Sequence, residues 1–226
     1  MRVIALLSGG KDSVCAVETA RGLGWDVAAA LVLKPAQDDA WMFHTPNLGV
    51  VAGVADCLGL PLVEADVRSG KAEEVEDLQA AVQAAKDDLG LDGLVSGALA
   101  SEYQRTRLDR IGHDVGLKSF APLWHKEPRG YVDSLVAAGW DIRFSRTAAD
   151  GVPTAWAGQR LDAAKVAAMA GHRSQPHVAG EGGEYETLVL DAPCYRRRLV
   201  IEDARIEESA SRATWRVESW RTEAKA

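Results

Sequence analysis

The sequence predicts an α/β protein, in which a doubly wound, mainly parallel sheet is followed by a smaller α+β unit. In the first half of the 226 residues, short apolar runs alternate with helical patterns at the spacing of βαβ units. The second half is less regular and ends in runs that suggest a closing antiparallel ribbon. We therefore expect an N-terminal domain over residues 1–125 and a C-terminal domain over residues 126–226.

In the first half, apolar runs of strand length alternate with amphipathic patterns that end close to a glycine. The predicted strands are Arg2–Leu7, Asp26–Leu33, Pro61–Val67 and Gly93–Ala98. The predicted helices begin at Asp12 or Ser13 and end at Gly24, and then cover Pro46–Leu58, Lys71–Leu89 and Glu102–Val115. Sequential strands joined by helices favour a parallel sheet with helices on both faces.

The second half predicts fewer helices and more strands. The predicted helices are Pro128–Ala138 and Asp162–Ala170. The predicted strands are Asp141–Thr147, Glu186–Asp191, Arg197–Ile206 and Thr214–Trp220. A glycine-rich loop, Gly180–Gly183, precedes the second of these strands.

Composition excludes several classes of protein. The net charge is −7, and the whole excess lies in residues 1–125, which carry 11 Lys/Arg and 18 Asp/Glu. This balance argues against a generic nucleic-acid binder. No apolar run approaches the ~20 residues of a membrane-spanning helix, so we expect a cytoplasmic protein without membrane contact. The three cysteines form no C-x-x-C pair, which excludes a disulfide scaffold and a cysteine-rich metal site.

The segment Ser8–Ser13, with the sequence SGGKDS, lies between the first predicted strand and the first predicted helix. Ligands of open α/β sheets bind at the carboxyl ends of strands, and the amides of a glycine-rich loop and a helix N-terminus favour phosphate or pyrophosphate. Lys11 adds a cation, and Asp12 can hold Mg²⁺ or cap the helix. The spacing fits neither the Walker A loop nor the G-x-G-x-x-G fingerprint.

These residues match the SGG-x-DS loop of the PP-loop ATP pyrophosphatases, which have an adenine-nucleotide-hydrolase-like fold. Three further segments resemble the diphthine–ammonia ligase family within that group. They are Ser101–Arg107, Pro122–Trp124 and Gly180–Thr187, the last followed by Leu190–Pro193. The resemblance covers essentially the whole chain.

The resemblance implies an AMP-forming ligase that uses ATP and Mg²⁺. Such an enzyme joins ammonium to the carboxylate of diphthine, or of a related compound, through an acyl adenylate, and releases AMP and pyrophosphate. The carboxylate would then be that of a modified histidine on an elongation factor. Whether the chain forms a homodimer stays open.

Site residues are expected in both halves of the chain. The expected catalytic residues are Lys11, Asp12, Arg105, Glu184 and Glu186, with Asp12 also as the metal ligand. The expected nucleotide-binding residues are Ser8, Gly9, Gly10, Lys11, Asp12, Ser13, Leu33, Gly97 and Gln104. Arg105 and Arg107 do not share a helix face, so only one is expected in the site. Alternation along a strand predicts that Glu184 and Glu186 share a face.

Two other functions stay open at this point. One is a PP-loop enzyme that adenylates a nucleobase carbonyl in tRNA modification, although the missing C-x-x-C pairs argue against sulfur transfer. The other is a nucleotide-binding sensor without turnover. Tyr103, Trp124 and Trp156 could line the substrate site but are more typical of packing residues. His44 and His125 are interpreted as structural histidines.

Overall fold

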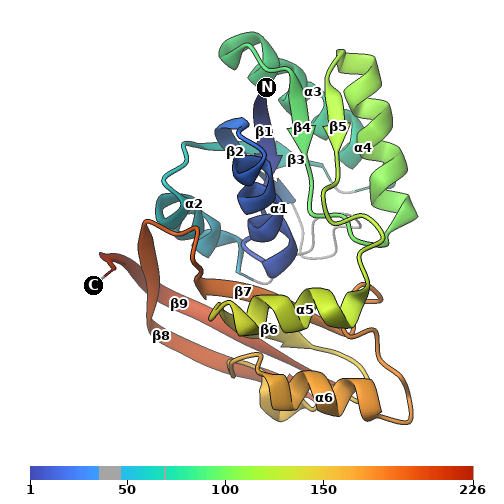
Figure 1. Cartoon of the computed structure of the whole chain (residues 1–226), viewed down its shortest axis with the longest axis vertical. Helices are drawn as coiled ribbons and strands as arrows, with labels where there is room; N and C mark the ends of the chain where they lie inside the picture. Colours follow the sequence, from blue (N-terminus) through green and yellow to red (C-terminus); the bar gives the residue numbers. More distant parts are fainter. Residues whose placement is uncertain (36–46, 69, 226) are drawn as a thin grey trace. The chain divides into compact units, whose positions relative to one another are not determined.

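The computed structural model describes residues 1–35, 47–68 and 70–225. The chain divides into two compact units (Figure 1). Unit 1 comprises Met1–Ser8, Asp12–Val51 and Leu60–Trp124, and unit 2 comprises Gly9–Lys11, Ala52–Gly59 and His125–Ala226. The boundary near residue 125 between two domains of contiguous sequence stays a prediction.

Unit 1 contains a five-stranded sheet in which every pairing is parallel. Its strands are β1 (Arg2–Leu6), β2 (Asp26–Pro35), β3 (Leu62–Val67), β4 (Gly93–Val95) and β5 (Lys118–Phe120). The order is β3-β2-β1-β4-β5, so β1 is central and the chain changes direction across it. The predicted doubly wound, mainly parallel α/β fold is confirmed.

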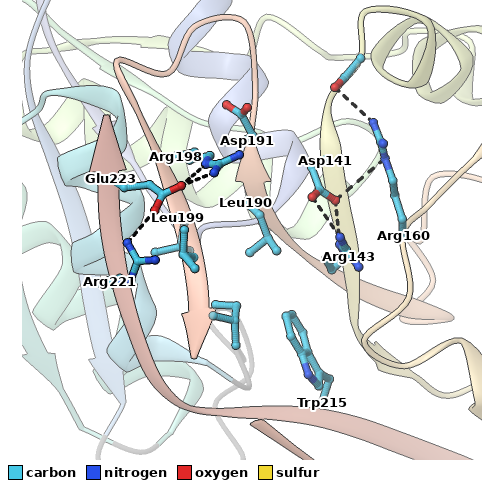
Figure 2. A pocket seen from close by; sticks show the side chains of 13 residues that line it. Asp141, Arg143, Arg160, Leu190, Asp191, Arg198, Leu199, Trp215, Arg221 and Glu223 are labelled. Carbon is cyan, nitrogen blue, oxygen red and sulfur yellow. Dashed lines mark hydrogen bonds and ion pairs between the residues drawn. The ribbon is translucent and has the colours of Figure 1, made fainter. Parts of the chain in front are cut away.

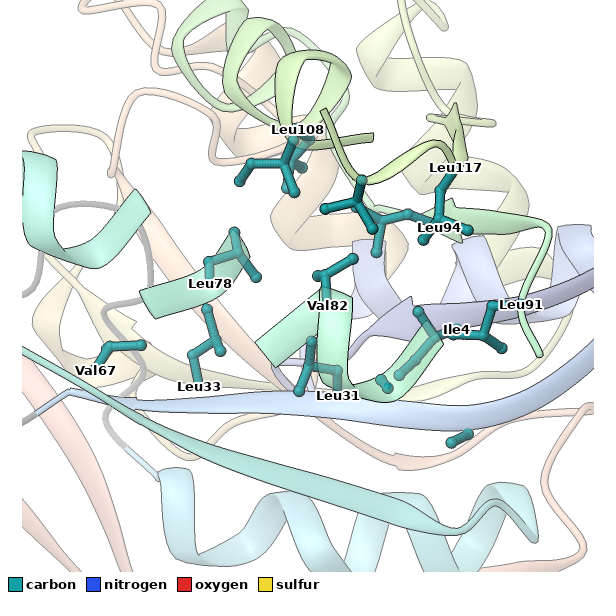
Figure 3. Packing of buried hydrophobic residues seen from close by; sticks show 14 residues of the cluster. Ile4, Leu31, Leu33, Val67, Leu78, Val82, Leu91, Leu94, Leu108 and Leu117 are labelled. Carbon is teal, nitrogen blue, oxygen red and sulfur yellow. The ribbon is translucent and has the colours of Figure 1, made fainter. Parts of the chain in front are cut away.

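Helices cover both faces of this sheet (Figure 1). On one face, α3 (Lys71–Leu89) and α4 (Glu102–Val115) pack against alternate strand residues. Figure 3 shows Leu78 and Val82 of α3 against Leu31 of β2 and Ile4 of β1. Val14 and Val17 of α1 (Lys11–Gly22) are also buried, but they lie outside that cluster and belong to the opposite face. The apolar residues that recur along α1, α3 and α4 thus form the stripe that each helix buries against the sheet.

The element boundaries of unit 1 and of α2 differ from the predictions in several places. β4 is shorter than the predicted strand Gly93–Ala98, and the three-residue β5 was not predicted because it is too short to give an apolar run. The predicted helix Pro46–Leu58 is a 3₁₀ turn, η1 (Leu48–Val50), that leads into α2 (Val51–Leu58). Pro46 and His44 lie outside the described residues.

Unit 2 contains a four-stranded antiparallel sheet in the order β7-β6-β9-β8. Its strands are β6 (Asp141–Thr147), β7 (Tyr185–Asp191), β8 (Arg197–Ser209) and β9 (Arg212–Ala224). Its other elements are α5 (Pro128–Ala137), η2 (Thr154–Trp156) and α6 (Ala163–Gly171). The predicted α+β character of the second half and its antiparallel ribbon, β8–β9, are confirmed, but unit 2 is not smaller than unit 1.

Carboxylate side chains cap the starts of α5 and α6. The Glu127 carboxylate accepts hydrogen bonds from the backbone N–H groups of Arg129 and Gly130 before α5. The Asp162 carboxylate accepts one from Lys165 at the start of α6. Each carboxylate satisfies amides that the helix itself leaves without acceptors.

The long ribbon β8–β9 is attached to the rest of its sheet over a short stretch. β9 pairs with β6 at two positions only, Arg146 with Thr214 and Thr147 with Ala213. The ribbon also packs on α2, where a Cβ on Gly53 would come within 2.7 Å of both Leu199 and Trp220. A larger residue at position 53 would therefore have to displace these side chains.

All three cysteines are free thiols, as the sequence predicts. Burial raises the pKa of Cys57 to about 12, so this thiol is unreactive near neutral pH. Among residues 1–35, 47–68 and 70–225, no helix is both long enough and apolar enough to span a bilayer.

Candidate active site

The predicted phosphate loop Ser8–Ser13 follows β1, the central strand of the parallel sheet. Gly9 has a φ of 80°, a conformation that favours glycine. The Ser13 hydroxyl accepts a hydrogen bond of 3.2 Å from the Ser8 amide, and the two hydroxyl oxygens are also 3.2 Å apart. The loop therefore lies at the carboxyl end of the strand where the connections reverse, which is where open α/β sheets bind ligands.

Gly97 lies against this loop, as expected for a residue of the same site. A Cβ at position 97 would be 2.6 Å from the carbonyl carbon of Asp12 and 2.7 Å from the amide nitrogen of Ser13. Both are backbone atoms, which cannot move aside easily. The chain after β4 packs closely against the start of α1. This packing is enough to explain why position 97 is glycine, without a contact to a ligand.

Lys11 is 2% exposed, and three residues that it contacts, Ala179, Tyr185 and Thr187, belong to unit 2 with it. Its amide donates to the Thr187 hydroxyl at 3.1 Å, and its ammonium donates to the Ala179 carbonyl at 2.6 Å. The ammonium also lies 5.2 Å from the centre of the Tyr185 ring, a cation–π distance. The Val189 amide donates to the Gly9 carbonyl at 3.0 Å. The start of β7 and the turn before it therefore hold the loop, a role that no sequence pattern indicates.

Arg105, the arginine expected in the site, lies near the start of α4. Its guanidinium carbon is 4.5 Å from the centre of the Trp124 ring, and its Nε is 3.4 Å from the Asp109 carboxylate. The side chain is 39% exposed, so the guanidinium can still reach a ligand. Arg107 instead stacks on Tyr103, with 3.3 Å between its guanidinium carbon and the ring centre.

Gln104 and Leu33 were expected to contact the nucleotide. The backbone N–H of Gln104 donates to the Ser101 hydroxyl, which caps α4. Leu33 is 3% exposed and its side chain belongs to the core cluster of unit 1 (Figure 3). A nucleotide contact of Leu33 would therefore have to come from its backbone.

The two expected catalytic glutamates have different partners. Glu184 precedes β7, and its carboxylate accepts hydrogen bonds from the amides of His177 at 2.9 Å and Gly182 at 2.8 Å. It therefore closes the glycine-rich turn. Because Glu184 lies outside the strand, the alternation argument for a face shared with Glu186 does not apply to it.

Glu186 lies within β7 and pairs with Arg146 of β6 at 3.2 Å. Burial raises the pKa of Glu186 to about 7, against the opposing effect of Arg146 and Arg212. Tyr185 and Thr187, which contact Lys11, alternate with Glu186 along the strand, so Glu186 points to the other face of the sheet. The structure thus brings Glu186 to Arg146 and separates it from Lys11.

The remaining candidates take part in packing. Trp156 lies 5.6 Å from Phe144, measured between ring centres, and the Trp124 ring is covered by Arg105. His125 has a φ of 57° at the start of the second half of the chain. Among the described residues, no group of three or more His, Cys, Asp or Glu side chains could hold a metal ion.

Comparison with known proteins identifies the family. Residues 1–119 match the model of the diphthamide synthase N-terminal domain, and residues 127–221 match that of the diphthamide synthase C-terminal domain. A diphthine–ammonia ligase of Danio rerio is 29% identical over 89% of this chain and 87% of its own length. The corresponding protein of Homo sapiens is 27% identical over 91% of this chain and 85% of its own.

A third relative is longer. The diphthine–ammonia ligase of Schizosaccharomyces pombe is 31% identical over 93% of this chain, which spans 38% of that protein. Among solved structures, a predicted subunit of tRNA methyltransferase from Methanocaldococcus jannaschii is 16% identical, covers 85% of this chain and 98% of its own, and has a TM-score of 0.41. A likeness at this level supports no conclusion about function. The matches of both domain models are specific, and they show that this chain belongs to the diphthamide synthase family.

Proposed function

We propose that this protein is an ATP-dependent amide ligase of the diphthine–ammonia ligase type. The observation that carries the proposal is the position of Ser8–Ser13 after the central strand β1, in a chain that matches both domains of the family. Neither nucleobase adenylation nor a sensor without turnover gains support from the comparisons.

The reaction has two steps. A carboxylate oxygen of the substrate attacks the α-phosphorus of ATP, and pyrophosphate leaves. Ammonia then attacks the acyl carbon of the adenylate, AMP leaves with the electron pair of the broken C–O bond, and the new amide loses a proton. Activation is needed because a carboxylate is anionic and has no good leaving group.

The loop supports the first step through its amides. In this proposal the amides of Ser8–Ser13 and the N-terminus of α1 bind the phosphates and stabilise the departing pyrophosphate. Arg105, whose guanidinium stacks on Trp124 and is 39% exposed, adds a second cation at the edge of the same sheet. Lys11 acts mainly by fixing the loop, because its ammonium is held by the Ala179 carbonyl.

One residue of this site is suited to bind Mg²⁺. Mg²⁺ in ATP-dependent enzymes is typically bound by one or two carboxylates together with substrate phosphates and water. Asp12, in the first turn of α1, supplies one carboxylate at the loop. We propose that Asp12 holds an ion that arrives with ATP and that neutralises phosphate charge. We further propose that the reaction takes place in the cytoplasm and that its carboxylate belongs to a modified histidine of an elongation factor.

For the second step we propose Glu186 as the proton acceptor, since a pKa of about 7 matches a general base at neutral pH. Glu186→Gln tests it: ATP affinity should stay close to wild type while amide formation falls. Amide formation at the wild-type rate would make Glu186 a structural residue only.

The ligase activity itself is tested by product analysis. The full chain, incubated with ATP, Mg²⁺, ammonium and diphthine-bearing elongation factor, should give AMP, pyrophosphate and amide in equal amounts. Label in the γ-phosphate should appear in pyrophosphate. Asp12→Ala should abolish turnover with the fold retained, and Asp88→Ala, an exposed change on α3, should have no effect. ADP and free phosphate, in a preparation without pyrophosphatase, would contradict the proposal.

A further inference from the structure

An edge strand of unit 2 holds part of the phosphate loop. In the order β7-β6-β9-β8, β7 pairs with β6 on one side and with no other strand among the described residues. The segment Gly9–Lys11 belongs to the same unit and contacts β7 at two positions. The Val189 amide donates to the Gly9 carbonyl at 3.0 Å, and the Lys11 amide donates to the Thr187 hydroxyl at 3.1 Å. The two positions are two residues apart, so Gly9–Lys11 runs beside β7.

These contacts set the direction of the two peptide groups on either side of Gly10. The C=O and N–H of a planar trans peptide point in opposite directions, and the described residues contain no cis peptide. Since the Gly9 C=O points to β7, the N–H of Gly10 points away from the strand. Since the Lys11 N–H points to Thr187, the C=O of Gly10 also points away from it. The strand therefore determines the direction of the Gly10 amide.

Two amides of the loop are already used within the protein. The Ser8 amide donates to the Ser13 hydroxyl at 3.2 Å, and the Lys11 amide donates to Thr187. In the proposed function the loop binds phosphates through its amides, so this binding depends on the others. Among those, the Gly10 amide is one whose direction β7 sets. Donors that are fixed before the reaction stabilise developing charge without a cost of reorganisation.

Two buried threonines of the same sheet differ in their contact with the loop. Thr187 is 8% exposed, and its hydroxyl accepts from the N–H of Lys11, the first residue of α1, whose amide has no acceptor within the helix. Thr147 of β6 lies opposite Tyr185 and is 0% exposed, and its hydroxyl has no hydrogen-bond partner among the described residues. The same substitution at both positions therefore separates the loop contact from the loss of a buried hydroxyl.

The strand that carries Thr187 is itself held along its length. It pairs with β6 from Tyr185 to Asp191. Figure 2 shows its far end, where Leu190 and Asp191 leave the strand in different directions. Asp191 pairs with Lys225 at 2.6 Å, and Leu190 is 9% exposed. A strand fixed in this way is a stable support for the loop.

We propose that Thr187 is a positioning residue for the first step of the ligase reaction. By holding the Lys11 amide, its hydroxyl keeps the Gly10 amide directed at the phosphates of ATP while pyrophosphate leaves. The inference rests on the proposed function, because it requires that the phosphates bind to Ser8–Ser13. A displacement of about 1 Å in a reacting site costs on the order of 100-fold in rate, so a single hydroxyl that fixes the loop has a measurable effect.

The test isolates the first step by pyrophosphate exchange. The full chain is incubated with ATP, Mg²⁺, diphthine-bearing elongation factor and labelled pyrophosphate, without ammonium. Label enters ATP only when pyrophosphate attacks the α-phosphorus of the acyl adenylate and the carboxylate leaves. Thr187→Val should lower the exchange rate at saturating ATP by about 10- to 100-fold, because valine offers no acceptor to the Lys11 amide. Thr187→Ser keeps the hydroxyl and should restore most of the rate.

Two controls separate positioning from stability. Thr147→Val makes the same chemical change at a hydroxyl without a partner among the described residues, and its exchange rate should equal that of wild type. Val166→Ala removes buried methyl groups from α6 and shows what a loss of stability alone does. It should leave the exchange rate unchanged at temperatures at which the variant is folded.

The outcomes distinguish this inference from the proposed function. No exchange by the wild type would overturn the proposed function and the inference with it. Exchange by the wild type at a rate that Thr187→Val or Thr187→Ala matches would overturn the inference alone. An equal fall in Thr187→Val and Val166→Ala would make Thr187 a structural residue only. If Thr187→Val does not fold, the comparison of Thr187→Ser with Thr187→Ala tests the same oxygen.

Discussion

Replacement of Glu186 by Gln should change how stability depends on pH. Burial within β7 raises the pKa of this carboxyl from its ordinary value of 4.5 to about 7. The folded protein therefore keeps the proton to a higher pH than the unfolded chain does. The stabilisation from the protonated carboxyl is fully present below pH 4.5 and is lost as the pH rises to about 7.

The size of the effect follows from the two pKa values. A tenfold change in proton affinity corresponds to about 1.4 kcal/mol, so the rise in pKa from 4.5 to about 7 amounts to about 3 kcal/mol. The side chain is 27% exposed, so solvent screens part of this and the figure is an upper bound. Gln retains an oxygen that can accept from Arg146, which limits the loss of the pair itself.

The assay is urea denaturation of wild type and Glu186→Gln between pH 5 and pH 8. The free energy of unfolding of the variant, relative to wild type, should rise with pH by up to about 3 kcal/mol. Glu207→Gln is the control. Arg205 and Arg216 lower the pKa of Glu207, so its stabilisation is present above pH 4.5 and is lost only at lower pH. Its difference from wild type should stay flat in this window.

A constant difference between wild type and Glu186→Gln from pH 5 to pH 8 would refute the reasoning. It would mean that the carboxyl titrates at its ordinary pKa despite its burial. The argument for Glu186 as a base near neutral pH would then be lost as well.

Three further substitutions test other contacts. Gly97→Ala places a methyl group 2.6 Å from the backbone of Asp12. It should cost about 1–3 kcal/mol of stability and weaken ATP binding. Gly22→Ala is the control, since its methyl group has no atom within 4 Å and should be tolerated. Calorimetry measures both effects. Thr187→Val removes the acceptor of the Lys11 amide and should cost about 1–3 kcal/mol in urea denaturation, while Thr187→Ser should stay near wild type. Glu184→Ala removes the acceptor of two amides in the glycine-rich turn and should speed limited proteolysis there.

The fold could be predicted because its signals are local. The apolar periods of Lys71–Leu89 and Glu102–Val115 reproduce α3 and α4 to the residue, and the alternation of strands and helices predicts the parallel sheet. β5 was not predicted, since three residues are too few to show a period.

The candidate site was predicted only in part. Gly97, one of the expected nucleotide-binding residues, does lie beside the loop Ser8–Ser13. The role of Thr187 could not be predicted, because its contact with Lys11 joins residues far apart in the sequence and follows no spacing rule. The alternation argument that placed Glu184 on the same face as Glu186 does not hold, since β7 begins at Tyr185 and Glu184 belongs to the turn before it.

The division of the chain into units has a consequence for synthesis. Unit 2 contains Gly9–Lys11 and Ala52–Gly59 together with His125–Ala226, so its earliest residues leave the ribosome long before their partners exist. Leu199 and Trp220, which pack against Gly53, are synthesised long after it. At a ribosomal rate of ~5–20 residues per second, that delay is roughly 10–30 s. During this interval the apolar side of α2 must be shielded from water by other parts of the nascent chain or by a chaperone.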